Sequence, residues 1–321
     1  ISQLEAEIRT LNSSNEIEWT PVQAIHRYSN SKVGLRITTQ LGYSLDLTND
    51  HSVYSLSNTA GKAEIVLKKA GSLQVGEYLV FEPRMTKEST DPHIKLYTDA
   101  PETWLAFPFS PEEVRKAVQN PKTRYKRLHG AHGPCLTLSE VKSAGLNLGA
   151  QHNLYTVGAN NHWFPSIVPT ETLAWLVGFS IGNGWIDGLS LGLSVRDSKI
   201  PLLEKEIQQL PGHVHARYIK RPGSIEAKIS CRPLVNWMSR WLKGVRAPHK
   251  RLPHEVLGWS IAAKRLFIQG LTDSDEYVSP TAKGRESLTY TTTSKGLELD
   301  LIYLFRSLGA YPYVKESNNL H

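Results

Sequence analysis

Two polar side chains, Asn183 and Asp275, end two apolar segments that lie about ninety residues apart. Each segment also carries small residues four positions apart, and these are Gly178, Gly182, Gly270 and Ser274. Residues four apart share one face of a helix, so small ones let two backbones approach closely, as in small-xxx-small membrane helices. Two such helices side by side would bring positions 183 and 275 together. Oxygen ligands meeting at one point suit a divalent metal, and a metal there suits phosphodiester cleavage.

The two segments read LVGFSIGN at 176–183 and IQGLTDSD at 268–275. At these residues the chain resembles the LAGLIDADG homing endonucleases in their single-chain form with two repeats. Residues 250–253 and 267–271 also resemble the family's approach to its second motif. Either segment alone would be read as an ordinary buried amphipathic helix. Two copies at this spacing, each followed by a strand-like segment and a helix, favour the family, which implies a pseudo-two-fold αββαββα domain over 166–321 that cuts both strands of DNA.

The resemblance implies that Asp275 and Asn183 are catalytic and hold Mg²⁺, with Gly182 and Ser274 completing the metal site. The family usually has Asp at position 183. Asn keeps a carbonyl oxygen but lacks the negative charge, so it binds a hard cation more weakly. Glu276 replaces a usual Gly, and the left-handed turn there costs another residue about 1–2 kcal/mol. We therefore expect DNA binding to survive and cleavage to be impaired, through natural loss or an inactivating substitution.

Lys228 matches the place of a family lysine that is implied to stabilise developing charge or to orient water, in the strand before the last helix of a repeat. A phosphate contact or a solvated lysine explains it equally well. The family lays a saddle of strands along the major groove, where side chains contact base edges. Candidates for this saddle are Ser190, Gly192, Ser194, Arg196, Arg217, Ile219 and Lys228. All predicted DNA contacts are Lys122, Arg124, Lys126, Arg127, Arg196, Arg217, Lys220, Arg221, Lys228, Arg232, Lys250 and Arg251.

Periodicity predicts the elements that would position these residues. In the first repeat we expect a helix at 173–184, a strand at 189–195, a helix at 200–210, a hairpin of 214–219 with 224–230, and a helix at 233–242. In the second repeat we expect a strand at 287–293, a helix at 295–308 and a new strand at 311–315. The second repeat would then lack its final strand and helix.

Upstream, residues 18–56 alternate as short strands, expected at 21–28, 35–39 and 43–47. They end in Thr48-Asn-Asp-His51, which resembles the splicing block of inteins and related HINT domains, and residues 70–80 resemble a later segment of the same domain. The resemblance implies that His51 polarises the scissile peptide and that Thr48 assists. The expected fold is therefore α+β, with a β-rich HINT-like domain at 1–90 and the endonuclease embedded in an intein.

The splicing part looks incomplete, because the chain begins with Ile1 rather than a Cys or Ser nucleophile and ends in Asn318-Asn-Leu-His321. The HINT part appears without its first strand, and Cys135 and Cys231 are near neither end. We expect a host protein, the extein, in cis, and no splicing by this chain alone.

Between the two resemblances, residues 91–165 form a small helical insert. Ser110 followed by Pro111 predicts a helix start, a basic linker at 122–129 follows, and a second helix runs over 137–144 and ends at Gly145. The insert resembles an accessory DNA-recognition module of some inteins. A packing insert that only bridges two domains is the alternative, and the pattern favours neither.

Composition agrees with a polyanionic partner. The formal net charge is +7, and Lys and Arg concentrate between Arg217 and Arg265, where only Glu226 and Glu255 oppose them. No apolar run approaches the length of a membrane span, and two cysteines without CxxC spacing suit a reducing compartment. We expect a monomer that binds double-stranded DNA, without membrane, in the cytoplasm or with the host gene in nucleoid or nucleus.

Three rival interpretations stay open. The same fold can serve a DNA-binding protein or an RNA maturase in which the acidic positions have degenerated. It can also serve a splicing element whose decayed nuclease is only a linker between HINT halves. A chance match in an unrelated multidomain enzyme is the third.

Overall fold

The computed structural model describes residues 7–12, 14, 17–24, 34–59, 62–80, 92–156, 162–275, 277–280 and 286–315. It mixes helices with antiparallel sheets, so the expected α+β class is confirmed. Two compact units emerge, one of residues 1–83 with 311–321 and one of residues 84–310. Across the described residues, no helix combines the length and apolar character that a membrane span requires.

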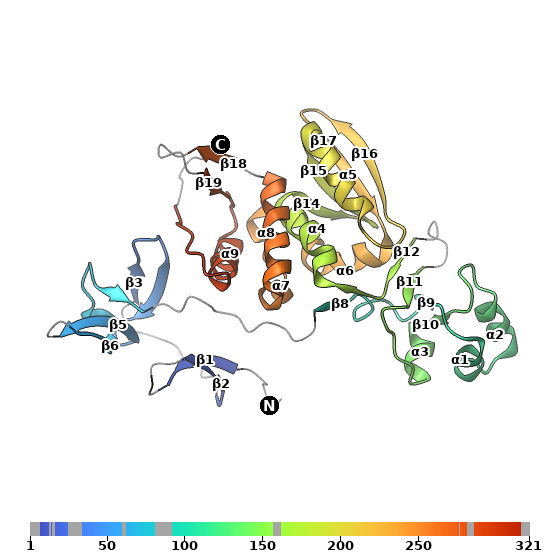
Figure 1. Cartoon of the computed structure of the whole chain (residues 1–321), viewed down its shortest axis with the longest axis horizontal. Coiled ribbons are helices and arrows are strands. Elements are labelled where there is room, and N and C mark those ends of the chain that lie inside the picture. The colour runs from blue at the N-terminus through green and yellow to red at the C-terminus, as the bar shows by residue number, and fades with distance from the viewer. Residues whose placement is uncertain are drawn as a thin grey trace. The chain divides into compact units, whose positions relative to one another are not determined.

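The first unit is built from strands (Figure 1). Two hairpins pair β1 with β2 and β3 with β4, and a three-stranded sheet has the order β6-β5-β7. The bounds are β1 Glu7–Leu11, β2 Ile17–Pro21, β3 Gly34–Thr38, β4 Ser44–Thr48, β5 Ser52–Thr59, β6 Lys62–Lys69, β7 Tyr78–Leu79 and the short helix η1 Ala70–Ser72. The strands expected at 35–39 and 43–47 are confirmed. The strand expected at 21–28 is wrong for 22–24, since β2 ends at Pro21, and residues 25–28 lie outside the described part.

The segment at 311–315 joins this first unit. Val314 N donates to Leu41 O at 2.9 Å, and the Tyr43 hydroxyl donates to Pro312 O at 2.7 Å. Gly42, at φ +84°, turns the β3–β4 loop so closely under Val314 that a Cβ there would lie 2.2 Å from its carbonyl oxygen. The strand expected at 311–315 is wrong. This segment makes isolated hydrogen bonds to the β3–β4 loop instead of a ladder of backbone hydrogen bonds, and Pro312 has no N–H to contribute to one.

In the second unit, the helices of the insert begin where the sequence carries caps. Ser110 accepts a hydrogen bond from Glu113 N and Thr137 accepts one from Glu140 N, each within a capping box. The expected basic linker at 122–129 is wrong, because Asn120 caps a helix there, with Pro121 at its first position. The bounds are β8 His93–Lys95, β9 Leu105–Phe107, α1 Pro111–Ala117, α2 Pro121–Leu128, β10 Leu136–Thr137, α3 Leu138–Ser143, β11 Asn153–Tyr155, β12 Trp163–Pro165 and β13 Ile167–Pro169.

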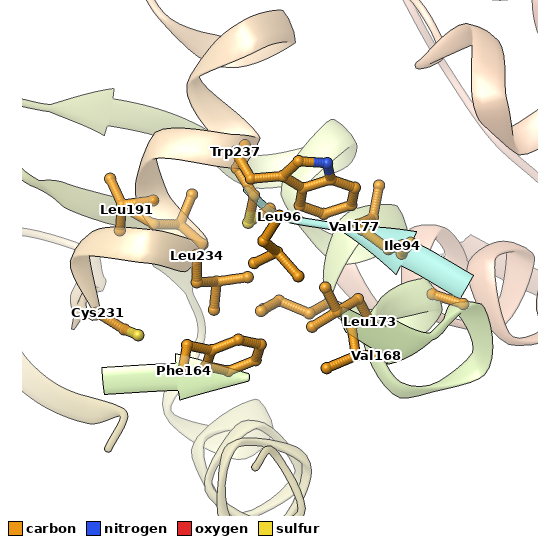
Figure 2. Close-up of a cluster of buried hydrophobic side chains, with 14 of the residues drawn as sticks. Ile94, Leu96, Phe164, Val168, Leu173, Val177, Leu191, Cys231, Leu234 and Trp237 are labelled. Carbon is orange, nitrogen blue, oxygen red and sulfur yellow. The ribbon is translucent and has the colours of Figure 1, made fainter. Parts of the chain in front are cut away.

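The insert shares a hydrophobic core with the elements that follow it. Two sheets, β10-β9-β11-β12 and β13-β8, organise its strands. Leu96 and Phe164 pack with Leu173, Leu191 and other buried side chains (Figure 2). The division at 165–166 predicted from the sequence is therefore not a break in packing, and the three-part domain organisation remains an interpretation.

Next comes a run of helix, two strands, helix, two strands and helix. The bounds are α4 Thr170–Asn183, β14 Gly184–Asp187, β15 Ser190–Val195, η2 Asp197–Lys199, α5 Ile200–Gln208, β16 His215–Arg221, β17 Ser224–Ser230 and α6 Arg232–Leu242. The sheet has the order β14-β15-β17-β16, with every pair antiparallel. Apolar residues of β15 and β17 share the buried core with α4, α5 and α6, so these helices cover one sheet face. The elements expected in this part are confirmed.

The last part of the second unit contains η3 Ala247–His249, α7 His254–Gly258, α8 Ile261–Asp275, β18 Tyr277–Pro280, β19 Glu286–Thr289 and α9 Lys295–Ser307. The helix expected over the second motif at 268–275 and the one expected at 295–308 are confirmed. The strand expected at 287–293 is shorter, because β19 ends at Thr289.

Candidate functional site

Helices α4 and α8 lie side by side and touch through their backbones (Figure 1). A Cβ built on Gly178 would lie 2.0 Å from the carbonyl oxygen of Phe267, and a Cβ built on Gly270 would lie 1.9 Å from that of Trp175. Real Cβ atoms essentially never come within 3.0 Å of such an atom. Both positions therefore require glycine, as the small-residue spacing predicted.

These contacts are reciprocal. The two sequence motifs align Gly178 with Gly270, and the same alignment places Trp175 opposite Phe267. Gly178 meets the carbonyl of Phe267, and Gly270 meets the carbonyl of Trp175, so the two glycines make equivalent contacts. Reciprocity of this kind is what a two-fold contact requires.

Side-chain hydrogen bonds join the helices along their length. Near their starts, the Ser260 hydroxyl donates to Glu171 at 2.7 Å, and this bond lowers the pKa of the Glu171 carboxyl. Further along, Trp175 Nε1 donates to Asp273 Oδ2 at 2.8 Å. At the C-terminal ends, Asn183 Nδ2 donates to the backbone oxygen of Ser274 at 2.6 Å. The structure therefore brings three predicted site residues, Asn183, Gly182 and Ser274, together at one end of the pair.

The oxygens at this end are already engaged. Lys250 Nζ donates to the backbone oxygens of Ile181 and Gly182, both at 2.8 Å. The Ser274 hydroxyl donates to Leu271 O at 2.7 Å, and its backbone oxygen accepts from Asn183. Asp275 ends α8, and its side chain lies outside the described part of the structure.

Among the described residues, this arrangement does not fit the implied Mg²⁺. A hard divalent cation prefers several oxygen ligands, carboxylates among them. At the helix ends, Gly182 O holds an ammonium group and Ser274 O holds an amide, while Asn183 brings no charge. Among the described residues, no group of three or more His, Cys, Asp or Glu side chains is placed to hold a metal ion.

A polar cavity of about 250 Å³ adjoins the helix ends. Its lining joins Asn183 and Ser274 to residues after β15 and in the β16–β17 turn, including Ser194, Arg196, Lys199 and Ser224. Arg196, a predicted DNA contact, is exposed there. Arg196 and Lys199 line this cavity beside the C-terminal ends of the helices, whose carbonyl oxygens carry partial negative charge.

The sheet face opposite the buried core is polar, and we call it the outer face. Strand pairing places Gly192, Lys228 and Arg217 directly opposite one another, so they share this face. Ser194, Glu226 and Ile219 form the next row of it. Trp185 lies over Gly192, where a Cβ would come within 2.4 Å of the indole. The predicted register Ser190, Gly192, Ser194 therefore faces away from the core.

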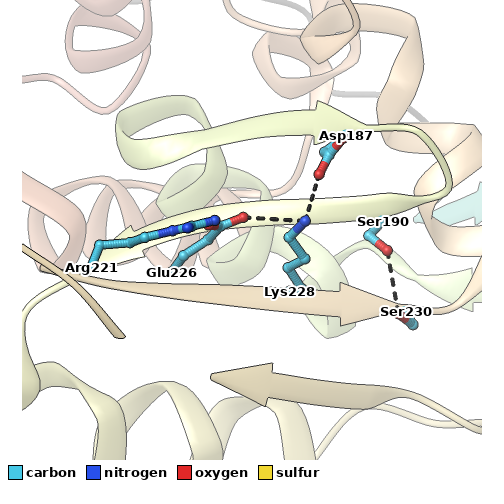
Figure 3. Close-up of polar contacts among 6 residues, drawn as sticks. All are labelled: Asp187, Ser190, Arg221, Glu226, Lys228 and Ser230. Carbon is cyan, nitrogen blue, oxygen red and sulfur yellow. Dashed lines mark hydrogen bonds and ion pairs between the residues drawn. The ribbon is translucent and has the colours of Figure 1, made fainter. Parts of the chain in front are cut away.

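Lys228 lies at the centre of an ion-pair network on the outer face (Figure 3). Its Nζ is 2.6 Å from Asp187 Oδ2 and 3.4 Å from Glu226 Oε1. The hydrogen bond to Asp187 raises the pKa of Lys228, while Arg221 lowers that of Glu226 by its own hydrogen bond. Lys228 is thus held protonated, which suits charge stabilisation or a phosphate contact and excludes a role as a general base.

The other predicted DNA contacts divide into three groups. Arg217 and Arg221 share the outer face with Lys228, whereas Lys220 points to the opposite side of β16. Lys122 and Lys126 are exposed on α2. The remaining ones are engaged with other parts of the protein: Arg124 with the oxygens of Val118 and Gln119, Arg127 with Glu140, Lys250 with α4, and Arg251 with Asp300 although its side chain stays more than half exposed; Arg232 has its Nε buried.

The predicted splicing residues lie in the first unit. Thr48 ends β4, and His51 N donates to Thr48 O at 3.0 Å across the turn. Ala70 N donates to His51 O at 2.7 Å, and Gly71 N donates to Asn49 O at 2.8 Å. The two segments that resemble a HINT domain, 48–51 and 70–80, are therefore in contact, with the His51 side chain exposed.

Sequence reasoning missed Asp187, Asp300 and the internal role of Lys250. Asp187 pairs with Lys228 across 41 positions, and Lys250 reaches α4 across 68. No local pattern carries such pairs. The available signal was the Lys-Arg dipeptide at 250–251, which lies upstream of α7 and of the motif helix α8.

Comparison with protein families gives one match. Residues 262–321 match the LAGLIDADG-like domain, a stretch that includes nearly all of α8 and everything after it. This match supports a homing-endonuclease-type domain in this part of the chain. Comparison with curated proteins gives no match. The resemblance to inteins rests on the sequence motifs alone.

Proposed function

We propose that the second unit is a two-repeat LAGLIDADG domain that recognises double-stranded DNA along its outer face, with α4 and α8 on a pseudo-two-fold axis. The reciprocal glycine contacts of these helices carry the proposal, because they relate a segment inside the matched family domain to one outside it. The run α4 to α6 supplies one complete αββαββα repeat.

The outer face suits a duplex. Strands present alternate side chains to a groove, and Arg and Lys are the residues that most often contact guanine edges and phosphates. Lys228 and Arg221 are held by acidic neighbours, which fixes their direction. Arg217 has no partner among the described residues and is exposed. We expect a long site read through many imperfect contacts and an affinity that falls steeply with salt.

Cleavage by this form is expected to be lost or weak. The intein-encoded endonuclease expected from the sequence would make an Mg²⁺-dependent double-strand break, and the described residues at the helix ends do not offer the ligands for it. Binding to DNA needs none of those ligands. The function that the geometry supports best is therefore site-specific DNA binding on a homing-endonuclease scaffold, by a monomer.

The test is selection of bound duplexes from a random library with the whole chain, in EDTA and in Mg²⁺. We expect one enriched site of a dozen or more base pairs in both conditions, and loss of binding when Arg217 and Lys228 are both changed to Ala. A matched double variant is Lys122→Ala with Lys126→Ala, which separates the outer face from α2. No enrichment at moderate salt would contradict DNA recognition and favour a splicing element whose nuclease part is only a linker.

A second candidate, an intein-like splicing unit with a host protein in cis, is favoured by one observation. Segments from both sides of the second unit, 39–43 and 312–314, bond to each other in the first unit. The second unit is thus an insertion within a discontinuous β-rich unit, as an embedded endonuclease would be. Fusion of the chain between two reporter proteins, with His51→Ala as the control, tests for His51-dependent cleavage at the upstream junction. Equal cleavage with and without His51 would exclude the splicing role of Thr48 and His51.

A further inference from the structure

Lys250 occupies the place where the C-terminal end of α4 needs a cation. The last carbonyls of a helix have no partner within it and carry partial negative charge. Lys250 Nζ bonds two of them, the oxygens of Ile181 and Gly182, at 2.8 Å each. Helices α4 and α8 end together, so their partial charges add at this point.

The backbone of Lys250 is anchored to α9. Ser294 Oγ, at the start of α9, donates to Lys250 O at 2.7 Å. The next residue, Arg251, is bidentate to Asp300, and Leu252 N donates to the same carboxylate at 3.0 Å. The backbone of Lys250 is therefore fixed beside the helix ends, and from this position its side chain reaches their carbonyl oxygens.

A divalent ion bound to Gly182 O would have to displace this ammonium group or share one oxygen with it. Two cations on one oxygen repel strongly where water is partly excluded. Asn183 adds a second obstacle, because its amide already occupies one of the two lone pairs of the Ser274 backbone oxygen.

We propose that Lys250 is the resident cation of the α4–α8 junction, and that it excludes divalent metal from it. The inference goes beyond DNA recognition, since it concerns the protein with or without DNA. The junction holds its two helix ends with an internal ammonium group, and its integrity is independent of Mg²⁺.

The test measures Mn²⁺ binding to the whole chain without DNA, by loss of the free-ion EPR signal. Five proteins are compared: the natural chain, Asn183→Asp, Lys250→Met, Asn183→Asp with Lys250→Met, and Asn183→Asp with Lys250→Arg. We expect no Mn²⁺ binding by the natural chain, and binding by the double variant that is at least about tenfold tighter than by Asn183→Asp. Lys250→Arg with Asn183→Asp keeps the charge and should match Asn183→Asp alone.

Two results would overturn the proposal. One is Mn²⁺ binding by the natural chain that Lys250→Met leaves unchanged. The other is equal affinity of Asn183→Asp with and without Lys250. Where Lys250→Met does not fold, the arginine variant and thermal unfolding of the natural chain in EDTA and in Mg²⁺ decide, because a metal-held junction would melt higher in Mg²⁺. DNA binding is a separate measurement, so its failure would leave this result intact.

Discussion

Alanine at Gly178 would place a methyl group 2.0 Å from the carbonyl oxygen of Phe267 and 2.9 Å from Leu271 N. Both atoms belong to the backbone of α8, so no side-chain rotation relieves the contact. The helices would have to separate by about 1 Å for the shorter distance to reach 3.0 Å, below which real Cβ atoms essentially never lie. We predict that Gly178→Ala destabilises the second unit.

The expected magnitude comes from two opposing effects. Alanine in a helix gains about 0.5–1 kcal/mol over glycine. Overpacking costs about 1–3 kcal/mol, and a backbone that cannot repack lies at the upper end of that range. The net loss of unfolding free energy should be about 2 kcal/mol. The sign of the change distinguishes the two effects, because helix propensity alone would raise the unfolding free energy, whereas the backbone contact lowers it.

Reciprocity makes a second variant informative. Gly270→Ala meets Trp175 O at 1.9 Å, and the same separation of the helices relieves both contacts. The double variant should therefore cost clearly less than the sum of the two single ones, by about 1 kcal/mol or more. Gly34→Ala in β3 is the control, since nothing lies within 4 Å of the position of its Cβ. It should change stability little.

Urea unfolding followed by tryptophan fluorescence measures all four proteins. A Gly178→Ala protein as stable as the natural chain would refute the backbone contact between α4 and α8. Strict additivity of the two alanines would refute its reciprocity, and with it the main support for the pseudo-two-fold proposal.

Three further predictions follow from single contacts. Arg217→Ala should lower DNA affinity and reduce the slope of log K against log salt by about 1, whereas Lys205→Ala, on α5 behind the sheet, should change neither; titration at several salt concentrations decides. Asp300→Asn should cost about 1–2 kcal/mol of unfolding free energy, because it weakens the bonds to Arg251 and Leu252 while Arg251 is more than half exposed; equal urea midpoints would contradict this. Burial, then His215 and His213, lower the pKa of His162, so stability should be full above about pH 6.5 and fall as the pH drops below it, and His162→Asn should flatten that profile.

The sequence anticipated the features that a local pattern encodes. Spacing of small residues predicted the close approach of α4 and α8, and the Ser110 cap predicted the start of α1. The prediction failed for side chains whose direction is set by a residue that the local sequence pattern does not reveal. The basic stretch at 122–129 reads as a linker until Asn120 is recognised as a cap, and Arg124 and Arg127 then turn inward. Lys250 and Arg251 read as phosphate contacts because their partners, Gly182 and Asp300, lie far away in sequence.

Asn183 and Lys250 have to be considered together, because each donates a hydrogen bond to a backbone oxygen at the helix ends. Asp at position 183 cannot donate to Ser274 O, so Asn183→Asp loses a cross-helix bond and sets a carboxylate beside a carbonyl. We expect it to lower the unfolding free energy by about 1–3 kcal/mol in EDTA. A cation that binds only the folded variant would return about 2.7 kcal/mol at a hundred times its Kd.

In Asn183→Asp, where Lys250 is kept, we expect Mg²⁺ to restore little of the lost unfolding free energy. In Asn183→Asp with Lys250→Met, we expect Mg²⁺ to restore most of it. Thermal unfolding of both variants in EDTA and in Mg²⁺ measures the difference. Full recovery by Asn183→Asp alone would show that Lys250 yields to the metal. Without such recovery, failure of Asn183→Asp to cut DNA would say nothing against an endonuclease ancestry, because the natural lysine would still hold the junction.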